Sequence, residues 1–344
     1  MEGKTFHSGV ATHMMQISER RIPKSPMLNS AILNDEISSF EMGTTVRSTK
    51  VAVAIISFNT ADLLRDCLRS VLLQSPAEVI VVDNASSDGS AEIVRTEFPH
   101  VTLKANPINL GYSKAANQAI TSSTAEYVLL LNGDTVLEPG ALLGLGNYLD
   151  LHPKAGLVGP RLLNVDGSLQ SSCRNFPRPF SLYPLIKYIP IWRNYYLLTW
   201  EHNQDRVVPW VTGAALAIRR KAFTSTGGFD ESYFMYFEEV DLSLRLQQKG
   251  WEIHFTPTST IMHVGQASAR QCRVEMEVEL YNSTKLFYRK HCPNVLRFLL
   301  IVTFKCKRLG RLIRDSARLL LTSDPENRKR ILQDIAAWRR VLGS

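Results

Sequence analysis

Asp134 is the carboxylate whose position in the sequence most clearly indicates chemistry. It follows the apolar run 127–131 through Asn132 and Gly133. This is the carboxyl end of a predicted buried strand, where ligands bind in open α/β sheets. A carboxylate there can hold Mg²⁺ or Mn²⁺, which prefer oxygen ligands and often share their site with substrate phosphates. The position therefore indicates a cation that bridges phosphates, with a simple turn residue before a helix as the alternative.

His263 is a candidate second ligand for the same cation. A neutral imidazole can join one carboxylate and two phosphate oxygens around a divalent metal ion. A single histidine after a strand is usually not a ligand. The assignment therefore depends on His263 meeting Asp134 in the fold.

The stretch 229–242 places three acids within four positions, beside several aromatic residues. On a helix, Glu238 and Asp241 share a face, while Glu239 points elsewhere. Aromatic surroundings raise the pKa of a carboxyl group and make it a better proton acceptor near neutral pH. We expect one acid to act as a general base and another to anchor the helix. A solvated acidic helix start, favoured by the helix dipole, would explain the acids but not the aromatic residues.

Polar residues after the first two predicted strands indicate a nucleoside pocket. Ser57 and Asn59 follow the apolar run 51–56, and Asp83 follows the run 79–82. Neighbouring parallel strands deliver such groups to one sheet edge, where a carboxylate can accept hydrogen bonds from a base or a ribose. The alternative for Asp83 is a residue that only shapes its turn.

A second anion-binding signal lies at a predicted helix start. The pattern consists of Asn109, Gly111 and Asn117. Gly111 has no side chain, so a ligand can come close to the backbone there. The N-terminus of a helix favours an anion such as a phosphate. A helix that merely begins with a glycine would give the same pattern.

Alternating elements predict the scaffold that must position these residues. Apolar runs and helical periodicity predict strands at 51–56, 79–82, 101–104 and 127–131, with helices at 61–73, 90–97, 111–121 and 139–151. Short connections between them imply βαβ units and a parallel sheet. Further on, the sequence predicts strands at 211–218 and 252–255, the latter stopping at Pro257, and a helix at 237–249. The GxGxxG and GxxxxGK[ST] patterns are absent, which counts against an NAD enzyme and a P-loop enzyme.

Composition indicates an ordinary globular protein of 344 residues, with 44% hydrophobic and 21% charged residues. Five scattered cysteines without a CxxC pair give no sign of a zinc site or a disulfide framework, and favour a reducing cytosol. We expect a flexible segment at 1–48, a catalytic domain at 49–290 and a helical tail at 291–344. The sequence contains no run of about 18 apolar residues, so we expect no membrane-spanning helix.

The tail carries the excess positive charge. Residues 297–344 hold twelve Lys/Arg and four Asp/Glu, which equals the net charge of +8 for the whole chain. Apolar residues lie between these charges: Leu299, Leu300, Ile301, Val302, Phe304, Leu309, Leu312, Ile313, Leu319, Leu320 and Leu321. This pattern favours a basic amphipathic helix on an anionic membrane surface. The alternative is a helix that packs on its own domain with a solvated basic face. No nucleic-acid-binding motif is present.

Taken together, these motifs resemble the family 2 inverting glycosyltransferases with the GT-A fold, over about residues 50–270. The order of the motifs carries the resemblance: Ser57-Phe58-Asn59, Asp83-Asn84 with Asp88-Gly89, Asn109-Leu110-Gly111, Asn132-Gly133-Asp134, Gly213-Ala214, Phe229-Asp230-Glu231, Glu238-Glu239-Val240-Asp241 and His263. Within the family, the chain looks most like the rhamnosyltransferase-type enzymes of bacterial cell-surface polysaccharide assembly. The resemblance implies an α/β fold with a Rossmann-like, mostly parallel sheet flanked by helices, followed by the C-terminal amphipathic helical extension.

The resemblance also implies roles for the candidate residues. Asp83 would bind the nucleotide base, with Ser57 and Asn59 lining the nucleoside pocket. Asp134 matches the last Asp of the family's DxD motif and would bind Mg²⁺ or Mn²⁺, with His263 completing the metal or diphosphate site. Glu239 matches the proposed base of the family's Glu-Asp motif. The remaining expected nucleotide-sugar contacts are Asn109, Gly111, Asn117, Asn132 and Gly133.

Two positions depart from the family pattern. Asn132 replaces the first carboxylate of DxD, and an amide oxygen is a weaker ligand. Glu239 is one methylene longer than the usual Asp. Both Glu238 and Glu239 therefore stay candidates for the base, with Glu239 favoured.

The expected activity is transfer of a sugar, with rhamnose as a candidate, from a nucleoside-diphosphate sugar to a hydroxyl of a glycan or lipid-linked acceptor, with inversion. Aromatic residues of 173–209, including Trp192, Tyr195, Tyr196 and Trp200, are expected to cover the acceptor. The expected location is cytoplasmic, peripheral on the inner face of the plasma membrane.

Two alternatives to this activity stay open. A sugar-1-phosphate nucleotidyltransferase would need a glycine-rich basic loop after the first strand, which Phe58-Asn59-Thr60 is not. A catalytically lapsed nucleotide-sugar-binding protein stays open because of Asn132.

Overall fold

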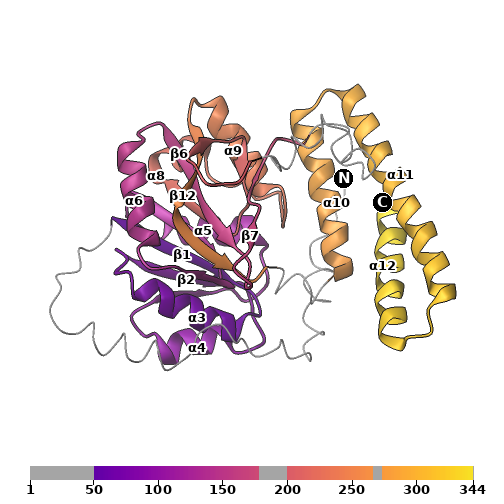
Figure 1. The fold of residues 1–344 in the computed structure, drawn as a ribbon, viewed down its shortest axis with the longest axis horizontal. Coiled ribbons are helices and arrows are strands. Elements are labelled where there is room, and N and C mark those ends of the chain that lie inside the picture. Colours follow the sequence, from indigo (N-terminus) through magenta and orange to yellow (C-terminus); the bar gives the residue numbers. More distant parts are fainter. Residues whose placement is uncertain (1–49, 178–199, 266–272, 344) are drawn as a thin grey trace, which may run out of the picture.

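A ten-stranded sheet flanked by helices forms the centre of the molecule (Figure 1). The computed structural model describes residues 50–177, 200–265 and 273–343. The first half contributes β1 (Val51–Ser57), α3 (Ala61–Leu72), β2 (Val79–Asp83), α4 (Ser90–Glu97), β3 (Thr102–Ala105), α5 (Tyr112–Thr121), β4 (Tyr127–Asn132), β5 (Thr135–Leu137) and α6 (Ala141–Leu151).

The second half completes the sheet and adds three long helices. Its elements are β6 (Ala155–Leu163), β7 (Leu169–Gln170), β8 (Cys173–Arg174), β9 (Arg206–Val207), β10 (Trp210–Val211), β11 (Ala215–Arg219), α8 (Arg220–Thr226), α9 (Glu238–Gln248), β12 (Glu252–His263), α10 (Arg273–His291), α11 (Asn294–Leu321) and α12 (Pro325–Gly343). The strand order is β3-β2-β1-β4-β11-β6-β12-β5, with β7 beside β6 and β9 beside β12. Strands β8 and β10 form a separate pair.

The first four strands in this order are parallel, which confirms the predicted βαβ units. The sheet becomes mixed at β11, which runs antiparallel to both β4 and β6. Register places Ser57 opposite Asp83 and Ile56 opposite Asn132. The carboxyl ends of β1, β2 and β4 therefore meet at one edge, as the polar residues after these strands had suggested.

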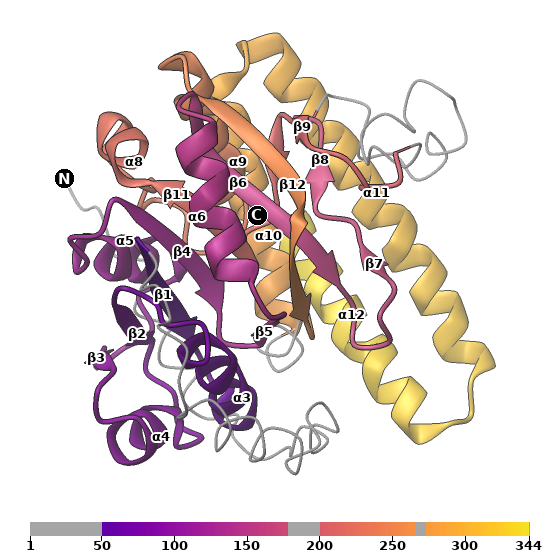
Figure 2. The same ribbon diagram turned by 60° about the vertical axis from the view of Figure 1, so that its left-hand side comes forward.

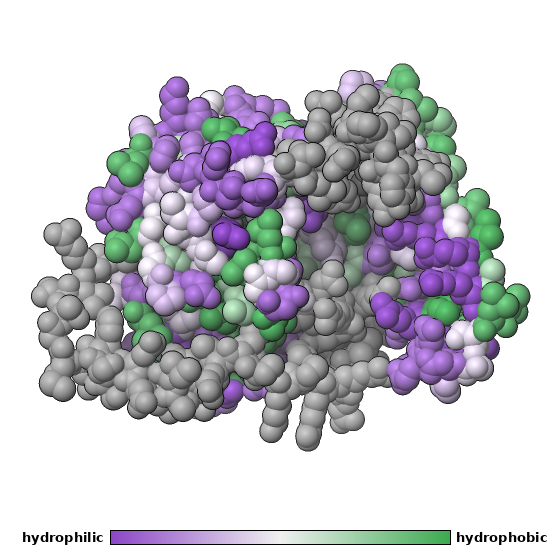
Figure 3. All heavy atoms as spheres, in the orientation of Figure 1, coloured by the Kyte–Doolittle hydropathy of each residue, from purple (hydrophilic) through white to green (hydrophobic). Residues whose placement is uncertain are grey.

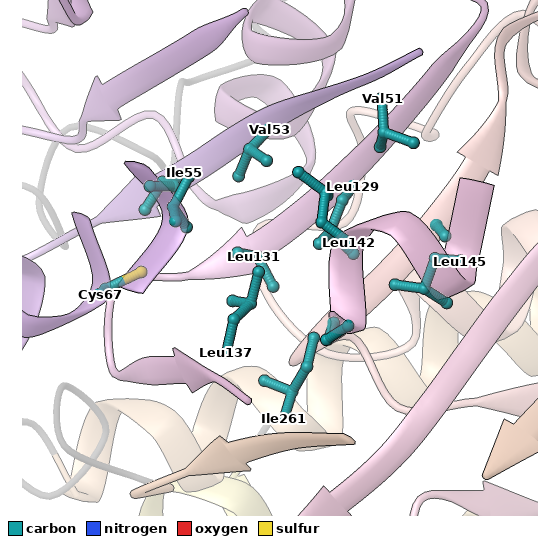
Figure 4. Close-up of a cluster of buried hydrophobic side chains, with 14 of the residues drawn as sticks. Val51, Val53, Ile55, Cys67, Leu129, Leu131, Leu137, Leu142, Leu145 and Ile261 are labelled. Carbon is teal, nitrogen blue, oxygen red and sulfur yellow. The ribbon is translucent and has the colours of Figure 1, made fainter. Parts of the chain in front are cut away.

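Strand β1 is apolar throughout because both of its faces are buried. Val51, Val53 and Ile55 pack with residues of α3, β4 and α6 on one side of the sheet (Figure 4). Ala52 and Ala54 point to the other side, into a cluster with residues of α5 and α9. The continuous apolar run of β1 thus indicates a central strand.

The second half differs from the sequence-based expectation in two strands. The strand expected at 252–255 continues past Pro257 to His263, with a register shift between Thr256 and Thr260. A proline is tolerated at such a bulge because no ladder hydrogen bond is required of it there. The strand expected at 211–218 is interrupted, since β10 ends at Val211 and β11 begins at Ala215.

The three C-terminal helices pack together, and α10 lies between the sheet and the pair formed by α11 and α12 (Figures 1 and 2). Phe287 and Tyr288 of α10 pack against Tyr233 and against Val240 of α9. Helix α10 therefore joins the expected catalytic domain to the expected tail. One face of the tail thus packs on its own domain, which the sequence analysis gave as the alternative to a membrane contact.

Some expectations fall on residues outside the described ranges. They concern the segment 1–48 and the aromatic residues Trp192, Tyr195 and Tyr196. Trp200 is described, and it stacks on His202 and packs edge-on against Phe255 rather than lining the cavity described below. None of the helices in the described ranges is both long and apolar enough to cross a membrane.

Candidate active site

A cavity of about 580 Å³ opens at the carboxyl edge of the parallel strands. Its lining comes from the ends of β1, β4 and β12, the starts of α5 and α9, the segment around β8, and one residue of α10. Eight residues predicted from the sequence are brought together here: Asn109, Gly111, Asn132, Gly133, Asp134, Glu238, Glu239 and His263. The two candidate ligands and the two candidate bases thus share one cavity.

Asp134 and His263 face each other. The distance between Oδ1 of Asp134 and Nε2 of His263 is 3.3 Å, and both side chains are mostly buried. The sheet creates this contact, because His263 at the end of β12 pairs with Thr135 at the start of β5. The backbone N–H of Val264 also donates to the carbonyl oxygen of Asp134. The longer β12 is therefore the element that delivers the histidine.

Gln170 on β7 fixes the orientation of the His263 ring. Nδ1 of His263 lies 2.7 Å from Oε1 of Gln170. The amide nitrogen of Gln170 donates to Oδ1 of Asn164 and to the carbonyl oxygen of His263, so the other amide atom is the oxygen. Since an amide oxygen only accepts, Nδ1 carries a proton, and Nε2 is the ring atom that faces Asp134.

These side chains fit a divalent cation. Nε2 of His263 is buried and has no hydrogen-bond partner within the described part of the chain. A metal-binding imidazole typically donates its other N–H to a fixed acceptor, as His263 does to Gln170. No cluster of three or more His, Cys, Asp or Glu residues suited to a metal occurs in the ranges described. Asp134 and His263 would therefore need oxygen ligands from elsewhere, such as phosphates.

Glu238 and Glu239 begin α9 and both line the cavity. Burial raises the pKa of Glu238 well above its usual value, and the neighbouring charge of Glu239 raises it further. Burial also raises the pKa of Glu239, but the nearby Arg174 and a hydrogen bond from the backbone of Gly213 oppose the rise. When the pair holds one proton, these surroundings favour it on Glu238 and leave Glu239 ionised.

Asp241 is the acid that anchors the helix. Its carboxylate accepts from Nε of Arg245 at 2.6 Å and lies 2.7 Å from Nε2 of His291 on α10. Only 1% of its side chain is exposed. The expectation that one acid serves as an anchor is confirmed. Glu239, expected to point away from Glu238, instead lines the same cavity.

The turn before α9 has an unusual backbone. Tyr236 and Phe237 both have φ of 69°, a left-handed conformation that is rare for bulky residues. Tyr236 lines the cavity together with Phe58, Phe234 and Met276 of α10. Non-glycine residues in this conformation cost about 1–3 kcal/mol each and concentrate at functional sites. The strained turn gives the acids an apolar wall.

The residues expected at the nucleoside have mixed placements. Asp83 is buried, and its Oδ2 accepts the backbone N–H of Ser86, while Oδ1 has no hydrogen-bond partner among the described residues. Burial raises the pKa of Asp83. Asn59 accepts the backbone N–H of Ser87 and so shapes the loop. Neither residue lines the cavity, although Asp83 keeps an oxygen for a ligand.

Ser57 and Asn117, both expected at the nucleotide sugar, do not line the cavity. Ser57 is fully buried, and its hydroxyl shares a hydrogen bond with Thr60, which does line the cavity. The amide of Asn117 donates to the carbonyl oxygen of Phe229 and accepts from its backbone N–H. Asn117 therefore holds the turn after α8 and is not part of the cavity lining.

The family model for "Glycosyl transferase family 2" matches residues 52–227, about half of the chain. The chain belongs to this family. It is 31% identical over 231 residues to an N-acetylglucosaminyl-diphospho-decaprenol L-rhamnosyltransferase of Mycobacterium tuberculosis, covering 61% of this chain and 75% of the relative. It is also 31% identical over 140 residues to the rhamnosyltransferase WbbL of Escherichia coli, covering 40% of this chain and 52% of WbbL.

A solved structure supports the fold. The mannosyltransferase PcManGT of Pyrobaculum calidifontis, solved with GDP-Man and Mn²⁺, superposes with a TM-score of 0.50 at 18% identity, covering 91% of this chain and 94% of that one. The expected GT-A architecture, with its mixed sheet, flanking helices and C-terminal helices, is confirmed.

Several cavity residues of this glycosyltransferase were not anticipated from the sequence. Asn84 donates to Oδ1 of Asn109 and accepts the backbone N–H of Leu110, so it organises the start of α5. Arg174 brings a positive charge close to Glu239. Gln170 orients His263. Asn84 directly follows Asp83 in a motif already singled out. Gln170 lies in the stretch 157–172, which the sequence predicts as short strands, and Arg174 in the weakly periodic stretch that follows, and neither carries a local signal of its contact in the cavity.

Proposed function

We propose that this family 2 glycosyltransferase is a metal-dependent, inverting enzyme of cell-surface polysaccharide synthesis. It transfers a sugar, with rhamnose favoured, from a nucleoside-diphosphate sugar to a hydroxyl of a lipid-linked glycan. The names of the M. tuberculosis and E. coli relatives support the sugar, and the first of them supports a lipid-linked acceptor. Such an acceptor favours a site of action at the cytoplasmic face of a membrane.

The observation that carries the proposal is the shared cavity of Asp134, His263 and Glu239. Asp134 and His263 would hold Mg²⁺ or Mn²⁺ together with the donor phosphates. When bound, this cation supplies positive charge that stabilises the departing diphosphate. Because Asn132 replaces a carboxylate, the motif has only one, and metal affinity depends more strongly on His263.

Glu239 is the proposed general base. The acceptor hydroxyl attacks the anomeric carbon while Glu239 takes its proton and the bond to the nucleoside diphosphate breaks. A single displacement of this kind inverts the anomeric configuration. Burial raises the pKa of Glu238 and so favours its neutral form, which does not compete for the acceptor proton. General-base assistance typically contributes about 10²–10⁴ in rate.

A thermal-shift panel tests the donor site. Nucleoside diphosphates and their sugars, added with and without Mn²⁺, should raise the melting temperature most for the true donor, because stabilisation follows affinity. We expect the shift to require Mn²⁺ and to disappear in Asp134→Ala. A shift that is the same with and without Mn²⁺, or that persists in Asp134→Ala, would contradict the metal site. Activity towards nucleoside triphosphates with sugar-1-phosphates would instead support a nucleotidyltransferase.

A further inference from the structure

One face of α11 exposes a row of apolar side chains. Its members are Val295, Phe298, Val302, Cys306, Leu309, Ile313 and Leu320. Intervals of three, four or seven residues place them on a single side of the helix. Val295, Phe298 and Leu320 are 75%, 68% and 86% exposed. We call this row the α11 stripe, and Figure 3 shows hydrophobic side chains along the right-hand edge where α11 lies.

The opposite face of α11 already holds the helix to the molecule. Phe304 packs against Tyr281 of α10, and Arg308 forms a 2.8 Å ion pair with Glu277 of the same helix. Asp315 accepts from the indole N–H of Trp338 on α12 at 3.0 Å. The α11 stripe is therefore not needed to fix the helix in place, and within the described ranges it has no covering element.

Charge indicates what the α11 stripe would contact. Helix α11 contains seven Lys/Arg and a single acid, Asp315, which is buried. Arg314 and Arg318 have side chains 58% and 65% exposed. Helical geometry places Arg314 on one flank of the stripe and Lys305 on the other, whereas Arg318 lies near the opposite face. Exposed apolar residues between basic flanks match an anionic lipid surface, whose headgroups attract the charges while the interface accepts the apolar groups.

We propose that the α11 stripe lies on an anionic membrane surface. At about 1.5 Å per residue, the helix presents an apolar contact about 40 Å long, parallel to the membrane plane. A second copy of the chain is a poorer occupant, since a symmetric contact would bring the basic flanks of both copies together. The membrane contact itself does not depend on which sugar is transferred.

The contact would also orient the active site. Helix α10 packs on α11 and α12 and places Met276 in the lining of the cavity. The bundle that carries the α11 stripe is therefore also part of the cavity wall. This consequence rests on the proposed function, because only a lipid-linked acceptor would require such an orientation.

Flotation of the full-length protein with vesicles tests the proposal. The probes are vesicles of phosphatidylcholine alone and of phosphatidylcholine mixed with phosphatidylglycerol. We expect binding to the anionic vesicles, and at least about a tenfold loss in the triple variant Phe298→Gln, Ile313→Gln, Leu320→Gln, since burying one such side chain is worth about a factor of ten or more. Lys305→Gln with Arg314→Gln should weaken binding to anionic vesicles and make it less sensitive to salt.

A matched control removes exposed apolar residues elsewhere. Leu143→Gln with Leu151→Gln on α6 changes side chains that are 48% and 77% exposed, and it should bind vesicles like the wild type. Circular dichroism and nucleotide-induced thermal shifts show that each variant is folded. Equal flotation of the triple variant and the wild type, or no flotation of the wild type, would overturn the proposal. So would a dimer in light scattering that the triple variant abolishes. Intact nucleotide binding in any of these cases would leave the proposed function standing.

Discussion

At the scale of single residues, the two glutamates at the start of α9 have different surroundings. Arg174 and the backbone of Gly213 favour the charged form of Glu239, whereas Glu238 is buried beside it. Perturbed pKa values in a cleft typically mark groups that move protons. We infer that the pair works as one ionised and one protonated carboxyl.

The raised pKa of Glu238 predicts a pH-dependent stability. A carboxyl group whose pKa is higher in the folded state stabilises the fold at low pH, and this contribution is lost as the pH rises through the folded pKa. Glutamine stays neutral, so Glu238→Gln should gain stability over the wild type as pH increases. We expect little difference near about pH 4 and a melting temperature about 2–4 °C higher near about pH 8.

Differential scanning calorimetry across this pH range measures the effect. Glu92→Gln on α4 is the matched control, because its side chain is 66% exposed. The difference in melting temperature between Glu92→Gln and the wild type should stay constant with pH. A Glu238→Gln difference that also stays constant would show that the carboxyl is ionised as easily in the folded chain as in the unfolded one.

Gln170 should control metal affinity without touching the metal. Removing its acceptor in Gln170→Ala frees the His263 ring to rotate or change tautomer, and such outer partners are worth about 10–100-fold in affinity. Titration of Mn²⁺ in the presence of a nucleoside diphosphate should show this loss, with Gln170→Glu restoring most of it because a carboxylate also accepts from Nδ1. The control Gln247→Ala, on the exposed side of α9, should bind like the wild type. Unchanged Mn²⁺ affinity in Gln170→Ala would refute the positioning role.

At the scale of elements, Gly111 sets how closely α5 approaches the turn before α9. Its φ is 84°, and a Cβ added there would lie 2.6 Å from the carbonyl oxygen of Phe234. That carbonyl accepts the backbone N–H of Tyr112, so it is held in place. The helix start and the apolar wall of the cavity are therefore built against each other.

Gly111→Ala should consequently lower the free energy of unfolding by more than backbone strain alone would. We expect a loss of unfolding free energy of about 2–4 kcal/mol, combining a left-handed alanine with a steric clash. Gly140→Ala provides the control, since Gly140 has φ of 80° but open space around its added Cβ. Urea denaturation of both variants measures the difference. Equal losses in the two variants would show that the approach to Phe234 is not tight.

Elements also explain what could and could not be predicted from the sequence. The apolar runs of β1, β2 and β4 and the residues that follow them predicted the parallel sheet and its ligand-binding edge, because these signals are local. The predicted end of β12 at Pro257 was wrong. The bulge that tolerates this proline depends on pairing with the neighbouring strand, which the local sequence does not show. Which side Ser57 and Asn117 face, and that Gln170 meets His263, depend on contacts between distant segments.

At the scale of the whole molecule, the C-terminal helices are part of the active site's architecture. His291 of α10 contacts Asp241, and Met276 of the same helix lines the cavity. The sequence suggested a boundary near residue 290, between a catalytic domain and a tail. Because α10 packs with both parts, we infer that the helices and the sheet work as one unit, with the cavity near their junction.

Turnover and nucleotide binding in Glu239→Gln, compared in the same preparation, test the central claim most directly. Replacing the proposed base should lower kcat by about 10²–10⁴, while Mn²⁺-dependent binding of the nucleoside diphosphate stays within about twofold, because Asp134 and His263 are untouched. Glu92→Gln should change neither quantity. A Glu239→Gln enzyme with nearly normal kcat would contradict the account, and so would one that loses nucleotide binding and turnover together.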